Sequence, residues 1–76
     1  MKELLTYIAK SLVDSPDQVV VTERQGDGEP LLELRVASED MGKVIGRQGR
    51  IAKWIRVLMR SVGQRKGIRV SVDITD

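Results

Sequence analysis

The chain has 76 residues, a net charge of +2, and neither cysteine nor histidine. This length predicts one domain, residues 1–76, with a small core, because such a chain buries only about 60% of its unfolded surface. Without cysteine or histidine there are no disulfides, no thiolate metal sites and no histidine general base, so we expect no metal, no cofactor and no enzyme.

The first predicted element is a helix over residues 2–13. Pro16 closes it, because proline cannot continue a helix and restricts the residue before it. This N-terminal segment lacks the apolar centre of a signal peptide, and no stretch of the chain reaches the ~20 apolar residues of a membrane span. We therefore expect a cytoplasmic protein without a membrane partner. The helix carries one apolar stripe: Leu4, Leu5, Ile8, Ala9, Leu12 and Val13.

Two strands are predicted next. The β-branched segment 18–25 predicts the first, and the alternating apolar and polar residues of 31–37 predict the second. Gly26 and Gly28 lie between them, and glycine readily adopts the positive φ of a hairpin turn. The two strands should therefore pair antiparallel.

Two helices follow, a short one that begins after Ser38 and ends before Gly46, and a longer one from about Arg50. Ser38 is the predicted N-cap of the short helix. Gly63 and Gly67 are predicted to mark the end of the long helix. The long helix carries an apolar stripe made of Ile51, Ile55, Leu58, Met59 and Val62.

Residues 68–74 alternate apolar and polar side chains and predict the last strand. The element order is therefore α-β-β-α-α-β. The helix pair must return the chain over one face of the sheet, so the third strand can run parallel to the second through a right-handed crossover. The expected fold is a two-layer α+β domain, a three-stranded sheet with helices on one face.

The turn between the two predicted helices is the most informative segment. Gly46 and Gly49 bracket Arg47 and Gln48 there. Glycine lets a phosphate backbone approach the main chain, because no Cβ stands in the way. The turn also precedes a helix N-terminus, whose free N–H groups and dipole favour an anion. We interpret the turn as a clamp on a phosphodiester backbone.

Basic residues surround this turn. The segment 43–69 holds nine basic residues and no acidic one, whereas the rest of the chain holds four basic and eleven acidic residues. Such a one-sided positive field attracts polyanions, including nucleic acids. Lys43, Arg50 and Lys53 are the predicted partners of the turn in this contact.

Two other glycine-containing motifs do not fit these residues. The phosphate loop of nucleotide hydrolases needs a different glycine spacing, and the dinucleotide fingerprint fails because position 44 is valine. A helix-turn-helix reader of duplex DNA stays open as the alternative function, since two helices flank a short glycine-containing turn. It would need polar base-reading side chains early in the second helix, where the sequence offers only Arg50 and Lys53.

The segment "VIGRQGRIAKWI" resembles the V-I-G-x-x-G-x-x-I signature of the KH domain, whose GXXG loop clamps four backbone nucleotides. The predicted element order resembles the type II arrangement, and the whole chain is similar to the small bacterial single-KH proteins of the KH-domain protein A family. One position departs from the signature: its last apolar slot falls on Ala52, with the isoleucine one place earlier at Ile51. The resemblance implies a non-enzymatic single-stranded RNA-binding protein, a post-transcriptional regulator or RNA chaperone linked to cell shape and cell-wall control.

The resemblance also implies roles for individual residues. The GXXG loop, Gly46, Arg47, Gln48 and Gly49, would lie against the sugar-phosphate backbone. The bases would lie in a groove, read by polar groups of the edge strand. The loop would be supported, and the groove walled, by apolar residues: Val44, Ile45, Ile51 and Ala52.

Trp54 lies beside the apolar stripe, about 60° from Ile51 on a helical wheel. The usual role of such a tryptophan is a half-buried place at the core edge. Among functional roles, we favour a partner-binding patch with Val57 over a base-stacking platform. Family relatives form homodimers, and heterodimers with a larger KH-containing RNA-binding protein, and two linked sites gain avidity.

Overall fold

The structure is a computed structural model that describes residues 1–25 and 29–76. Its helices and strands confirm the predicted α-β-β-α-α-β order. The predicted hairpin turn at Gly26 and Gly28 lies outside the described residues. In chain order the elements are helix α1 (Lys2–Leu12), strands β1 (Val20–Gln25) and β2 (Pro30–Arg35), helices α2 (Met41–Ile45) and α3 (Arg50–Arg65), and strand β3 (Ser71–Thr75).

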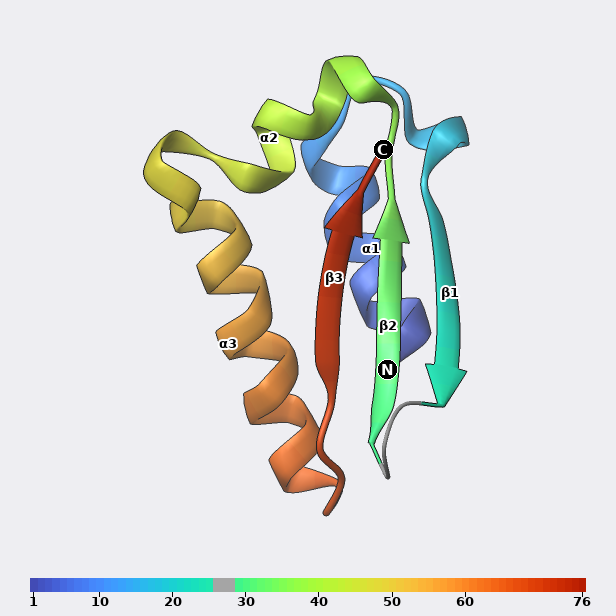
Figure 1. Cartoon of the computed structure of the whole chain (residues 1–76), viewed down its shortest axis with the longest axis vertical. Coiled ribbons are helices and arrows are strands. Elements are labelled where there is room, and N and C mark those ends of the chain that lie inside the picture. Colours follow the sequence, from blue (N-terminus) through green and yellow to red (C-terminus); the bar gives the residue numbers. More distant parts are fainter. Residues whose placement is uncertain (26–28) are drawn as a thin grey trace.

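The three strands form one mixed sheet in the order β1-β2-β3. Strand β1 pairs antiparallel with β2, and β3 pairs parallel with β2, as the crossover argument predicts. Figure 1 shows α1 packed behind the sheet and α3 running along the β3 edge. The two-layer α+β fold with helices on one face is therefore confirmed.

The core lies between this helical layer and the sheet. The alternation of the strands supplies one wall, since Val21 pairs with Leu34 and Leu32 pairs with Val72 on the covered face. Burying each such side chain contributes about 1.5–3 kcal/mol. The apolar side chains with 2% exposure or less come from α1, β2, α2 and α3: Leu5, Ala9, Leu32, Leu34, Val44, Ile55 and Met59.

The predicted strand start at residue 68 is wrong, because the C-terminal cap that follows α3 extends to Ile68. Gly67 has φ +73°, and its N–H donates to the Gln64 carbonyl at 3.1 Å. The Ile68 N–H donates to the Gly63 carbonyl at 2.9 Å, which completes a Schellman cap. Ile68 is therefore 40% exposed, and the pairing of β3 begins at Ser71. Gly63 lies inside α3, and only Gly67 follows its end.

Three other predicted positions differ from the structure. A turn at Pro16–Gln18 delays the start of β1 to Val20. Strand β2 begins at Pro30 and ends at Arg35, two residues before its predicted end. Ser38 does not cap α2, because Ser38–Asp40 forms another 3₁₀ turn with no side-chain cap. This turn places Asp40 directly before α2.

Candidate nucleic-acid interface

The turn between α2 and α3 has a backbone that favours glycine. Gly46 has φ +77° and ψ 175°, Gln48 has φ 59° and ψ 26°, and Gly49 has φ +73° and ψ 15°. The Gly49 N–H donates to the Gly46 carbonyl at 3.2 Å and closes the turn. A Cβ on Gly46 would lie 2.5 Å from Cγ1 of Ile51, so both backbone angle and space demand glycine there.

The turn presents bare main chain flanked by polar and basic side chains. Arg47 and Gln48 are exposed, and Arg50 Nη2 donates to Gln48 Oε1 at 3.4 Å. No side chain of the described residues caps the N-terminus of α3, which starts at Arg50. An anion at the turn therefore meets uncapped helix N–H groups and nearby cations. Lys53, one turn into α3, is also exposed.

The apolar residues expected to support this turn gather next to it. Val44 is fully buried and Ala52 is 3% exposed, so both belong to the core. Ile45 and Ile51 are half-buried and pack against the core cluster. Packed side chains from α2 and α3 therefore support the turn. That these residues line a ligand groove stays a prediction.

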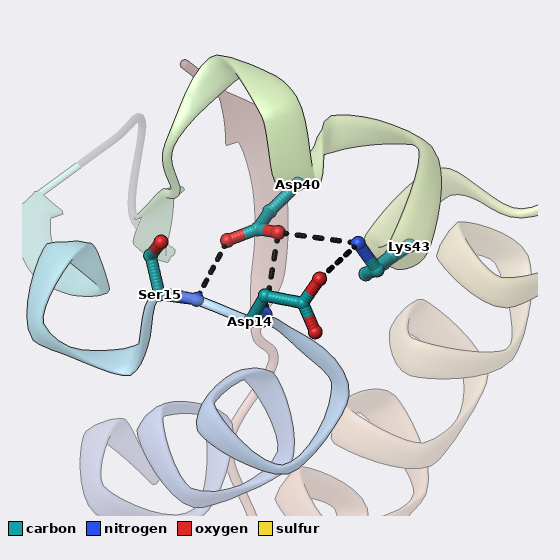
Figure 2. Close-up of polar contacts among 4 residues, drawn as sticks. All are labelled: Asp14, Ser15, Asp40 and Lys43. Atoms are coloured by element: carbon teal, nitrogen blue, oxygen red, sulfur yellow. Dashed lines mark hydrogen bonds and ion pairs between the residues drawn. The ribbon is translucent and has the colours of Figure 1, made fainter.

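Lys43 is engaged by two carboxylates (Figure 2). Its Nζ lies 2.8 Å from Asp14 Oδ2 and 3.5 Å from Asp40 Oδ1. The Asp40 carboxylate is buried, at 1% exposure, and accepts hydrogen bonds from the backbone N–H groups of Asp14 at 3.2 Å and Ser15 at 3.0 Å. These contacts tie the end of α1 to the start of α2. Lys43 therefore anchors the helix that leads into the glycine turn.

The ionisation of this cluster follows from its contacts. Burial alone would raise the pKa of the Asp40 carboxyl, but the hydrogen bonds from the Asp14 and Ser15 N–H groups and the Lys43 charge outweigh it. The net result is a lowered Asp40 pKa. The hydrogen bond with Asp14 raises the pKa of Lys43, against a smaller effect of burial. Both groups stay charged at neutral pH.

Two arginines on the β3 side of α3 were not among the predicted site residues. Arg56 Nε donates to the Val72 carbonyl of edge strand β3 at 3.2 Å. Arg60, one turn later, lines a hollow between the end of α3 and β3. The spacing of four residues from Ala52 to Arg56 to Arg60 would have identified them as one side of the helix.

Trp54 and Val57 are exposed, at 70% and 53%. The interpretation of Trp54 as a half-buried core-edge residue is therefore wrong. Trp54 also borders an apolar hollow of about 350 Å³, whose other walls include Ile8 and Leu12 of α1 and Ile51 of α3. Tyr7 of α1 is exposed as well, at 73%. Aromatic and aliphatic side chains thus remain open on the helical face.

None of the helices in the described part is both long enough and apolar enough to cross a bilayer. Within residues 1–25 and 29–76, no three His, Cys, Asp or Glu side chains are grouped as metal ligands.

The fold and the glycine turn together define a type II KH domain. The model of the KH domain of KhpA and KhpB matches residues 2–74, and the chain belongs to this family. The likeness to solved structures shows the same fold. A variant of Aquifex aeolicus Era bound to GDP and AlF4⁻ matches with a TM-score of 0.68 at 20% identity, over 97% of this chain and 29% of that chain.

Curated relatives match along nearly their whole length. The RNA-binding protein KhpA of Clostridium acetobutylicum is 57% identical over 74 residues, which are 97% of this chain and 99% of the relative. The protein of the same name from Treponema pallidum is 48% identical, over 99% of this chain and 94% of the relative. That of Chlamydia pneumoniae is 49% identical, over 100% and 97% respectively.

Proposed function

We propose that this chain is a non-enzymatic protein that binds single-stranded RNA by holding the sugar-phosphate backbone against the turn Gly46–Gly49. The observation that carries the proposal is the bare, positive-φ main chain of this turn at the uncapped start of α3. The relatives' name, RNA-binding protein KhpA, supports RNA as the ligand.

The exposed cations around the turn supply the phosphate contacts. Arg47, Arg50 and Lys53 are exposed and form no salt bridge among the described residues, so they can reach a strand laid over the turn, whereas Lys43 is already paired with Asp14 and Asp40. Lys43 therefore acts mainly by fixing α2. The half-buried Ile45 and Ile51 form the apolar wall beside the bound bases, and the buried Val44 and Ala52 support the turn from the core.

A duplex DNA reader of the helix-turn-helix kind is the weaker candidate. Its first helix would be α2, which has only five residues, and the start of α3 offers no amide or hydroxyl side chain for base edges. Competition between single-stranded RNA and duplex DNA of equal length separates the two functions. Preferential displacement by the duplex would contradict RNA binding.

The exposed apolar residues of the helical face support a dimer. Trp54 and Val57 would be covered by a second copy of the chain or by a larger KH-containing RNA-binding protein, and paired sites would gain avidity. Trp54→Asp with Val57→Asp should give a folded monomer in sedimentation experiments. Two results together would contradict this interface: a wild-type chain that is monomeric on its own, and a complex with the larger KH-containing protein that forms equally well with wild type and with the double variant. In the cytoplasm, such a dimer would serve as a post-transcriptional regulator or RNA chaperone, linked by resemblance to cell shape and cell-wall control.

Reversing the charge of the turn tests RNA binding directly. Arg47→Asp with Gln48→Asp keeps both glycines, and aspartate tolerates the left-handed angles of position 48. The double variant should fold, as circular dichroism would verify, and lose RNA binding because two carboxylates repel the phosphates.

The chain offers a matched control for this variant. Arg24→Asp with Gln25→Asp makes the same residue and charge changes on β1, at the opposite edge of the sheet from β3. The control should retain most of the affinity. Equal affinities of the two folded double variants would remove the turn from the mechanism.

A further inference from the structure

Arg60 and Arg69 line a hollow near the C-terminal end of α3. Figure 1 shows that this end of the helix is the one farther from the glycine turn. The hollow, of about 420 Å³, opens between the last turns of α3 and the start of β3. Its volume falls within the ~300–1,000 Å³ of small-ligand pockets.

The walls of the hollow combine the three chemistries of a nucleotide. Arg60 and Arg69 provide cations for a phosphate, Ile68 provides an apolar surface for a base, and Gln64 and Ser71 provide hydrogen-bonding groups for a base edge or a ribose. Ile68 is 40% exposed because the Schellman cap of α3 holds it outside the sheet pairing. A free apolar side chain therefore lies beside cations.

The two arginines are not equally available. Arg69 Nη1 lies 3.6 Å from the Glu29 carboxylate, whose other oxygen accepts a hydrogen bond from Ser71 at 3.4 Å. Among the described residues, Arg60 is not part of any salt bridge or side-chain hydrogen bond. Arg60 is therefore the cation best placed to take a phosphate.

A strand of four nucleotides held at the turn is long enough to reach Arg60 along α3. Arg50 and Arg60 are ten residues apart, about 15 Å along the helix axis at ~1.5 Å per residue. Four nucleotides cover at least about 14 Å, because the unstacked bases of a bound single strand are spaced more widely than the ~3.4 Å per nucleotide of a helical strand. Between the two ends, Arg56 lies on the same side of the helix and is held against β3 by the Val72 carbonyl.

We propose that the hollow at Arg60 binds the nucleotide that follows the four held at the glycine turn, so that the RNA footprint of one chain exceeds four nucleotides. This inference rests on the proposed function, because the strand reaches the hollow only when the turn holds it. Arg60 contacts the additional phosphate, and the base lies against Ile68.

The test compares two RNA lengths with two arginine variants. Arg60→Ala removes the proposed contact. Arg65→Ala, the matched control, removes the same charge from the same helix, but position 65 lies about 140° round the helix from position 60 at ~100° per residue. Both arginines are exposed, so both variants should fold. The ligands are tetranucleotides and octanucleotides of randomised RNA sequence, titrated at several salt concentrations.

For the octanucleotides, Arg60→Ala should weaken binding by about two- to fivefold, as expected for one exposed charge pair. It should also make the slope of log K against log salt shallower by about 0.7, the loss of one phosphate on a single strand. Arg60→Ala should bind the tetranucleotides with nearly wild-type affinity. Arg65→Ala should bind both the tetranucleotides and the octanucleotides with nearly wild-type affinity.

The possible failures are distinguishable. If wild type binds neither length, RNA binding itself is contradicted. If wild type binds the tetranucleotides and the two variants lose octanucleotide affinity equally, or neither loses any, only the extended footprint is contradicted. Extra binding registers in the longer RNA affect all three proteins alike and therefore cancel in the comparison.

Discussion

At the scale of single residues, the two glycines of the turn are required for different reasons. Gly49 has a positive φ but open space around its Cα, whereas Gly46 has a positive φ and Ile51 packed against it. A side chain at position 49 therefore introduces backbone strain alone, whereas one at position 46 adds a steric clash with Ile51. This difference yields a graded prediction.

Gly49→Ala should lower the free energy of unfolding by about 1–2 kcal/mol, the cost of a left-handed alanine. Gly46→Ala should cost more, because its Cβ would lie 2.5 Å from Ile51 Cγ1 and 2.9 Å from Ile51 Cβ. Urea unfolding of both variants measures the two values. Equal destabilisation would mean that Ile51 does not hold the turn against α3.

At the scale of secondary-structure elements, Asp40 joins the end of α1 to the start of α2. Asp40→Asn keeps the shape of the side chain but removes its charge and one acceptor, so the variant should be less stable than wild type at neutral pH. The same substitution at exposed Asp17 is a matched control and should have little effect.

The pH dependence of this difference has a definite direction. Because the Asp40 pKa in the folded state lies below its usual 3.8, the stability from its charged form is present above about pH 3.8 and is lost as pH falls through the folded value. The gap between wild type and Asp40→Asn in urea unfolding should therefore be constant from pH 5 to 7 and shrink below about pH 4. A stability difference between wild type and Asp40→Asn that does not change in acid would mean that the charged Asp40 carboxylate does not hold α1 and α2 together.

The periodicity of the sequence was sufficient to predict the elements themselves. Apolar spacing predicted α1 and α3, alternation predicted β2, and the crossover argument predicted the parallel pairing of β3. The ends of elements were harder, because an alternating pattern through residue 68 hid a helix cap formed by Gly67. Local patterns do not reveal which hydrogen bond a residue makes at a boundary.

The candidate site divides in the same way. The spacing of Gly46 and Gly49 and the charges around them are local signals, so the sequence predicted a glycine turn at the start of a basic helix. The pairing of Lys43 with Asp14 is not local, since 29 residues separate them. The contact of Arg56 with Val72 likewise depends on how α3 packs on β3. Only the tertiary structure shows that Lys43 pairs with Asp14 and Asp40.

At the scale of the whole molecule, the fold concentrates positive charge on one element. Helix α3 and its flanks carry the basic segment 43–69. Most of the acidic residues lie between α1 and α2, in β1, β2 and the segments that connect them to each other and to these helices. An approaching polyanion is therefore drawn toward α3 and repelled by the acidic part of the chain. The glycine turn at the start of α3 is where this field meets bare main chain.

The most direct test of the central claim is a nuclear magnetic resonance titration of the labelled protein with short single-stranded oligoribonucleotides. If the turn holds the sugar-phosphate backbone, the amide signals of residues 43–53 should shift first and most, and the exposed end of β1 near Gln25 should stay unchanged. Shifts elsewhere, with the amides of residues 43–53 unmoved at saturating RNA, would contradict the account.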